Sequence, residues 1–125
     1  MRIPTCSELM DVIAKNHFEI LKVTEDEEKC VIDFRHPTLK YGIIGLPPAY
    51  YNSSVYLNKN TGTLEVTVRR RVDGFKELYL EGCCENGINV CRPHVDMEEK
   101  TLSVEAKFHT NVKDRLNALL TEMYQ

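Results

Sequence analysis

The sequence lacks an apolar run long enough to cross a membrane, and it lacks an excess of positive charge. A membrane-spanning helix needs about 20 consecutive apolar residues, and no stretch approaches that length. The formal net charge is -3, whereas nucleic-acid binding relies on a cationic surface. We therefore expect no membrane span and no nucleic acid as a partner, which leaves another protein as the expected partner.

The first ten residues also lack the pattern of a secretory signal peptide, because Met1 to Met10 contains one arginine and no continuous apolar segment. The five cysteines are an odd number, which argues against a closed framework of disulfides. Free thiols without an export signal are typical of a reducing compartment. These observations predict a cytoplasmic protein, or one inside a host cell, with free thiols and no obligatory disulfide.

Neither an internal repeat nor a low-complexity linker divides the 125 residues. A chain of this length buries roughly two thirds of the surface of its unfolded form, which is enough for a hydrophobic core. Hydrophobic residues make up 42% and charged residues 28%, both ordinary for a globular protein. We expect a single domain over residues 1–125.

Helical patterns occur at both ends of the chain. Thr5 and Glu8 have the spacing of a capping box, and the apolar residues after them predict a helix. Its predicted end is Asn16, a residue type that tolerates the left-handed conformation at a helix C-terminus. A second helix is predicted to start at Thr110 or Asn111. Five apolar positions lie on one face of it and must be covered, namely Val112, Leu116, Leu119, Leu120 and Met123.

Between the two helices, apolar residues alternate with polar ones and are interrupted by turn signals. Phe18 to Arg35 predicts a hairpin with an acidic tip at 25–28, in which Cys30, Ile32 and Phe34 share a face. A first helix extended through Val23 fits the apolar spacing less well. Further strands are predicted at 55–57, 64–68, 75–80, 88–90 and 102–108. This order predicts an α+β fold, with about six or seven antiparallel strands in one curved sheet and both terminal helices packed on it.

The hydrophobic pattern also predicts a strand register after residue 71. A three-residue loop over 72–74 would pair Val66 with Leu80 and would require Gly74 in a left-handed conformation. A two-residue turn would instead place Glu81 opposite Val66 on the apolar face, which is unfavourable. The three-residue loop is therefore the predicted connection.

Cys83, Cys84, Cys91 and His94 come nearest to a metal site. Zinc sites usually separate paired cysteines by two to four residues, whereas here two are adjacent and the third follows seven positions later. Adjacent strand residues point to opposite faces, so the first two thiols would diverge. A redox role for Cys83 and Cys91 remains open, since a turn at 86–87 would place them diagonally across a hairpin. We expect no structural metal and no cofactor.

The basic run Arg69 to Arg71 is a possible phosphate site, but phosphate binding needs several cations on one surface. Arg70 would face away from its two neighbours, and Glu77 is expected opposite Arg69 as a cross-strand charge pair. None of the four histidines belongs to a recognisable catalytic motif. No catalytic residue is assigned, and the question of enzyme activity stays open with a preference against it.

The segment from Tyr41 to Tyr51 is the best functional candidate in the sequence. Segments rich in tyrosine and proline make large, rigid contacts at low entropic cost, and loops carry function more often than core elements do. The alternative is that this loop covers one end of its own core. The predicted partner-binding residues are Tyr41, Ile44, Leu46, Tyr50 and Tyr51.

Together these patterns predict a non-enzymatic protein–protein interaction module, such as an adaptor, a chaperone-like subunit or an inhibitor, acting as a monomer or homodimer. The alternative is a small-ligand-binding protein or an enzyme with its site between the sheet and the C-terminal helix. Such a site needs polar residues at inward strand positions. The inward positions that can be assigned, such as Leu64, Val66 and Val104, are apolar.

Overall fold

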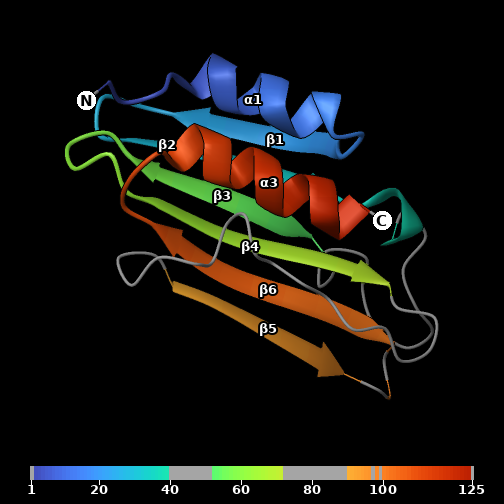
Figure 1. The fold of residues 1–125 in the computed structure, drawn as a ribbon. Helices are drawn as coiled ribbons and strands as arrows, with labels where there is room; N and C mark the ends of the chain where they lie inside the picture. The colour runs from blue at the N-terminus through green and yellow to red at the C-terminus, as the bar shows by residue number, and fades with distance from the viewer. Residues whose placement is uncertain (1, 40–51, 72–89, 97, 99, 125) are drawn as a thin grey trace.

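Two helices lie on the same face of an antiparallel sheet in the computed structural model (Figure 1). The structure describes residues 2–39, 52–71, 90–96, 98 and 100–124. Their elements are α1 (Cys6–Lys15), β1 (Glu19–Glu25), β2 (Lys29–Arg35), the short 3-10 helix η1 (Pro37–Leu39), β3 (Ser53–Asn58), β4 (Leu64–Arg71), β5 (Val90–Asp96), β6 (Thr101–Phe108) and α3 (Val112–Tyr124). The six strands of the described part follow the order β1-β2-β3-β4-β6-β5 in an open sheet. The predicted α+β fold is confirmed.

Alternation along the strands decides which side chains enter the core. Cys30, Ile32 and Phe34 of β2 are fully buried on the face that carries the helices, as predicted from their spacing. The same face receives the buried side chains of the other central strands, namely Val55, Leu57, Leu64, Val66, Val68, Leu102, Val104, Ala106 and Phe108. All of them belong to one hydrophobic cluster. A sheet with one covered face and one solvated face accounts for this pattern of period two.

The five predicted apolar positions of α3 are all buried against this cluster. The helix begins at Val112, directly after Asn111, which has a φ of 49°. The Asn111 carbonyl oxygen accepts the first helical hydrogen bond, from the Arg115 backbone N–H at 2.9 Å. The predicted start at Thr110 or Asn111 is therefore correct to within two residues, although the backbone there is left-handed instead of extended as in an ordinary N-cap.

The end of α1 differs from the prediction in one respect. Asn16 is the residue that ends the helix, but its φ is -91°, and the left-handed residue is His17 with a φ of 68°. The Asn16 side chain instead forms hydrogen bonds within and between the helices. Its Nδ2 donates to the Val12 carbonyl at 2.8 Å and to Asn117 Oδ1 at 2.9 Å. Thr121 Oγ1 donates back to Asn16 Oδ1. This buried network joins the end of α1 to α3.

Side chains from the sheet satisfy the last carbonyl groups of α3. Arg70 Nη1 donates to the Met123 carbonyl oxygen at 2.9 Å, and His36 Nε2 lies 3.0 Å from the Tyr124 carbonyl oxygen. Carbonyl groups at a helix C-terminus have no partner within the helix, so donors placed there stabilise its end. Arg70 faces the helices while Arg69 takes the opposite face, as the alternation along the strand predicted.

The predicted register of β4 is wrong. Strand β4 has neighbours on both edges, β3 on one side and β6 on the other. Val66 therefore lies opposite Val55 and Ala106, and it does not pair with Leu80. Alternation determines the face that a side chain takes but not the strand that lies alongside, so distant strands can occupy the place of a hairpin partner. Gly74, on which the predicted loop depended, lies outside the described residues.

Candidate functional site

The predicted partner-binding residues Tyr41, Ile44, Leu46, Tyr50 and Tyr51 lie outside the described residues. The residues that flank this segment are described, and both flanks are attached to β4. Before the segment, Thr38 Oγ1 accepts a hydrogen bond from the Arg71 backbone N–H at 3.3 Å. After it, the Asn52 carbonyl oxygen accepts from Arg69 Nη1 at 2.7 Å. The segment 40–51 thus leaves and rejoins the described fold at the C-terminal end of β4.

No element of the described ranges covers the sheet face opposite the helices (Figure 1). The side chains on this face of β4, β6 and β5 are mostly polar. These side chains form rows across neighbouring strands. Arg69 of β4, Ser103 of β6 and His94 of β5 are one such row. The neighbour of Arg69 on β6 is therefore Ser103, and the predicted partner Glu77 lies outside the described residues. The next row, two residues along each strand, is Thr67, Glu105 and Arg92.

Two hollows meet on this face of the sheet. The larger has a volume of about 510 Å³ and lies over β3, β4, β6 and the start of β5. The smaller has a volume of about 320 Å³ and lies over β4, β6 and β5. Arg92 and Glu105 line both, so the two hollows adjoin at these two residues. We call them together the sheet-face trough, defined by Ser54, Tyr56, Glu65, Thr67, Arg69, Arg92, His94, Ser103, Glu105 and Lys107.

Charge is unevenly distributed along the sheet-face trough. Near Tyr56, Lys107 Nζ lies 3.7 Å from Glu65 Oε1, and this exposed ion pair leaves little net charge. At the other end, Arg69 and His94 flank Ser103 across the strands and Arg92 lies in the next row, with Glu105 as the one carboxylate among the residues lining that hollow. One end of the trough is therefore cationic.

The end of the sheet-face trough over β3 carries an aromatic side chain, Tyr56. This side chain is 38% exposed on the uncovered face of the sheet. A half-exposed tyrosine offers an apolar ring face together with a hydroxyl group, the combination that is enriched at protein interfaces.

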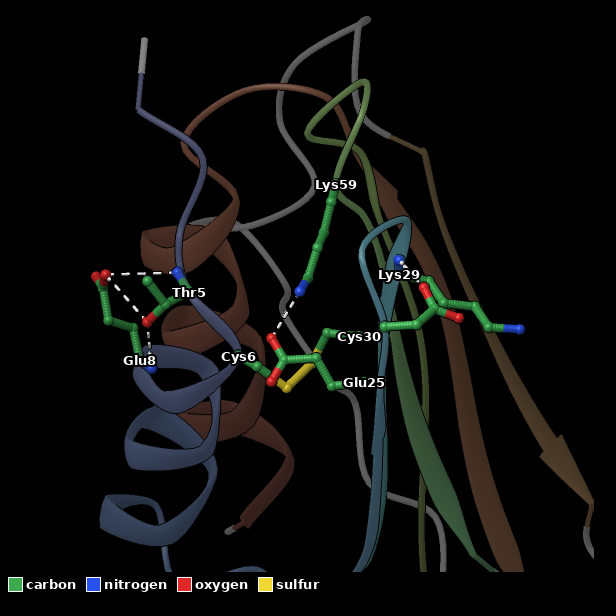
Figure 2. The surroundings of a disulfide bond; sticks show 8 residues. Thr5, Cys6, Glu8, Glu25, Lys29, Cys30 and Lys59 are labelled. Atoms are coloured by element: carbon green, nitrogen blue, oxygen red, sulfur yellow. Dashed lines mark hydrogen bonds and ion pairs between the residues drawn. A yellow bond between two sulfur atoms is a disulfide. The ribbon is translucent and has the colours of Figure 1, made fainter.

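A disulfide joins Cys6 to Cys30, so the prediction that all five thiols are free is wrong for these two. The bond links the first residue of α1 to β2, across a sequence separation of 24 residues and a Cα–Cα distance of 5.8 Å (Figure 2). Both residues are buried, at 4% and 0% exposure. Closing a loop of this size stabilises a fold by about 3 to 4 kcal/mol in the chain-entropy account.

The sequence contained a signal for this disulfide. Cys6 lies three residues before Leu9, on the buried stripe of α1, and Cys30 lies on the inward face of β2 with Ile32. These positions direct both thiols into the layer between helix and sheet. The number of cysteines does not reveal this disulfide, because an odd total of five is compatible with one bonded pair and three further cysteines.

Charged groups surround the disulfide (Figure 2). Glu25 lies opposite Cys30 in the hairpin, and its Oε2 forms an ion pair with Lys59 Nζ at 2.6 Å. On the helix side, Glu8 forms the predicted capping box, in which its backbone N–H donates to Thr5 Oγ1 at 3.1 Å. These interactions hold the turns on either side of the bond in place.

The Glu8 carboxylate has two further cationic partners. It accepts a hydrogen bond from the Arg2 guanidinium, and Lys113 Nζ of α3 lies 3.3 Å from its Oε2. The hydrogen bond from Arg2 is the largest cause that lowers the pKa of Glu8 to about 2. Glu8 is therefore ionised throughout the physiological range and links the chain's first residues to α3.

Metal binding receives no support from the described residues, in which no three His, Cys, Asp or Glu side chains are grouped so that they could hold an ion. Cys83 and Cys84 lie outside the described ranges, so the predicted absence of a metal stays a prediction. Within the same ranges, no helix is both long and apolar enough to cross a membrane.

The chain matches no protein-family model, and no curated protein or solved structure is significantly similar to it.

Proposed function

We propose that this chain is a non-enzymatic protein–protein interaction module that binds an acidic, extended segment of a partner in the sheet-face trough. The observation that carries this proposal is that two adjoining hollows together cross four strands and that the hollow at one end is lined by Arg69 and Arg92. Neighbouring strands lie about 4.8 Å apart, so the trough is about 15 Å long, which suits four to five extended residues.

The cationic end suits a carboxylate of the partner. Arg92 is exposed, and the Arg69 guanidinium is oriented by its hydrogen bond to the Asn52 carbonyl. Arginine binds carboxylates through two parallel hydrogen bonds, and the Ser103 hydroxyl between the two strands offers another donor. Glu105 opposes a second partner carboxylate near Arg92, which favours a single acidic anchor at this end.

The predicted Tyr41 to Tyr51 contact segment extends the same surface. Its flanking residues Thr38 and Asn52 are bound to the end of β4 that also supplies Arg69 to the trough. A partner that lies in the trough would reach the C-terminal end of β4, where this segment begins and ends. The role of Tyr50 and Tyr51 in binding stays a prediction.

The alternative, a ligand or catalytic pocket between sheet and α3, is less well supported. The side chains that fill the layer between the sheet and α3, including Val68, Val104 and Leu116, are apolar and fully buried. Such packing favours a filled core, whereas the polar and concave surface lies on the opposite side of the sheet. A cytoplasmic or host-cell location and a monomeric or homodimeric state remain parts of the proposal.

Site-specific photo-crosslinking in the native host tests the proposal. A photoreactive amino acid placed at Tyr56 should capture a partner protein through a segment that contains Asp or Glu. Arg92→Glu should reduce the crosslinking yield about tenfold, which corresponds to about 1.4 kcal/mol of binding free energy. Lys15→Glu is the matched control, because it makes the same charge change on the exposed side of α1 and should leave the yield unchanged.

Two outcomes would contradict the proposal. Equal losses from Arg92→Glu and Lys15→Glu would mean that only the net charge matters and that the sheet-face trough is not the docking surface. Efficient capture through a basic segment of the partner would contradict the assigned chemistry of the occupant.

A further inference from the structure

We propose that the Cys6–Cys30 disulfide is a reversible redox switch that controls how the N-terminal segment, residues 2–8, is held against the fold. The inference is independent of the proposed interaction surface, which lies on the other face of the sheet. It depends on what the disulfide joins, on what else holds this segment, and on what the segment encloses.

The disulfide is the strongest attachment of residues 2–8. Apart from it, the segment is held by the Thr5–Glu8 capping box and by the contacts of Glu8 with Arg2 and Lys113. Exposed ion pairs of this kind contribute little, because solvent screens them and long side chains lose entropy in forming them. Ile3 adds one packing contact, so close to Gly62 that a Cβ there would lie 3.2 Å from Ile3 Cγ1.

The rest of α1 does not depend on the disulfide. Leu9, Val12 and Ile13 are buried to 2% exposure or less in the common core, and Asn16 joins the far end of the helix to α3. Reduction should therefore release the first turn of α1 and leave the remainder of the fold in place. Such a local change is what distinguishes a switch from a disulfide on which the whole fold depends.

The released segment forms one wall of a hollow. Arg2, Ile3, Pro4 and Glu8 face Gly62, His109 and the first residues of α3 across a volume of about 380 Å³. Cys6 lies between the wall residues Pro4 and Glu8 in the sequence. The state of the disulfide thus determines whether this wall is fixed, and the hollow is formed in the oxidised protein and opened in the reduced one.

The proposed reaction is exchange with a dithiol, either a small molecule or a protein. A thiolate of the dithiol attacks Cys6 Sγ, the S–S bond breaks, and Cys30 leaves as a thiolate and takes up a proton. The second thiol of the reagent then displaces Cys6 from the mixed disulfide. In total the dithiol is oxidised to a disulfide, and Cys6 and Cys30 receive two electrons and two protons. The reverse reaction uses the oxidised dithiol.

The position of Cys6 at a helix start selects it as the point of attack. Cys30 is completely buried in the sheet, whereas Cys6 is 4% exposed at the first position of a helix, where turns fray most readily. When Cys6 is displaced from the mixed disulfide in the second step, it leaves as a thiolate that the backbone N–H groups of the first turn stabilise.

Peptide-resolved thiol labelling of the full chain under native conditions gives the first test. Trypsin separates Cys6, in 3–15, from Cys30, in 30–35, and from the remaining three cysteines. The protein is equilibrated with mixtures of reduced and oxidised dithiothreitol, quenched and alkylated. Cys6 and Cys30 should become labelled together in one two-electron transition, and oxidised dithiothreitol should restore the bond. Labelling that requires prior denaturation would overturn the proposal.

Hydrogen exchange of the same samples gives the second test. Reduction should accelerate exchange of the amides in residues 2–8 by about tenfold beyond any acceleration that the whole fold shares, whereas α3 should show only the shared loss of global stability that opening the loop implies. Cys6→Ser should exchange like the reduced protein, and reductant should have no further effect on its residues 2–8. Equal acceleration throughout the described strands and helices, or unchanged exchange in residues 2–8, would show that the disulfide is not a switch.

Discussion

His36 and Tyr124, which lie 88 positions apart in the sequence, are joined by a hydrogen bond of 3.0 Å between His36 Nε2 and the Tyr124 carbonyl oxygen. The Thr38 backbone N–H donates to His36 Nδ1 at 3.0 Å, so Nδ1 must be an acceptor and Nε2 must carry the hydrogen. The imidazole is therefore neutral in the fold. Protonation would add a hydrogen to Nδ1, which would then face the Thr38 backbone N–H, so that two donors would oppose each other.

This relationship predicts a pH-dependent stability. Burial is the main cause that lowers the pKa of His36 below its usual value of 6.5. The unfolded chain therefore binds more protons at this residue, and the stabilisation is complete above pH 6.5 and lost as the pH falls through the folded-state pKa. The melting temperature should decrease from pH 7 to pH 5. His36→Gln should flatten that decrease, whereas His94→Gln, on the exposed sheet face, should not.

Truncation of a buried α3 side chain should destabilise the protein strongly. Leu116 and Leu119 are fully buried, and replacing such a leucine by alanine removes apolar contacts and leaves a cavity. Leu116→Ala or Leu119→Ala should lower the free energy of unfolding by about 2 to 5 kcal/mol in urea titrations. Asp114→Ala, at an exposed position of the same helix, is the control. An unfolding transition unchanged after truncation at Thr110 would show that α3 is not needed for the fold.

The capping box of α1 provides a smaller and more local effect. Thr5→Ala removes the acceptor for the Glu8 backbone N–H and should reduce the free energy of unfolding by about 1 kcal/mol. Ser7→Ala changes a neighbouring exposed residue in the same turn and should have no comparable effect. Equal melting curves for wild type and Thr5→Ala would indicate that the disulfide alone fixes this helix start.

The tyrosines of the predicted contact segment can be tested once a partner is identified. Tyr50→Ala and Tyr51→Ala should each weaken binding by about 2 kcal/mol, or roughly thirtyfold, if they are aromatic anchors. Their melting temperatures should remain close to that of the wild type. Unchanged affinity combined with reduced stability would mean that the segment covers the core of its own protein.

Local patterns were sufficient to predict the helices and the inward faces of β2, β3, β4 and β6. Thr5 and Glu8 located the start of α1 because a capping box is formed by residues three positions apart. Alternation placed Ile32 and Phe34 in the core because successive strand residues point to opposite faces. These features depend on residues that are neighbours in the sequence, so the sequence by itself determined them.

The sheet-face trough could not be predicted from local sequence patterns. Arg69, Ser103 and His94 form one row only because β6 lies between β4 and β5, an order that no local pattern contains. The local composition of the sequence instead predicted Tyr50 and Tyr51 as partner-binding residues. The trough follows from strand order, which the tertiary structure decides.

The same reason explains the pairing of Val66 with Ala106 and the bond between Cys6 and Cys30. The entropy cost of closing a loop increases only slowly with its length, so a distant strand or cysteine competes on nearly equal terms with a local one. The sequence determined which way each of these side chains points. Which residue meets it there was decided by the packing of both helices and all the described strands around one core, because only the complete arrangement buries the apolar faces together.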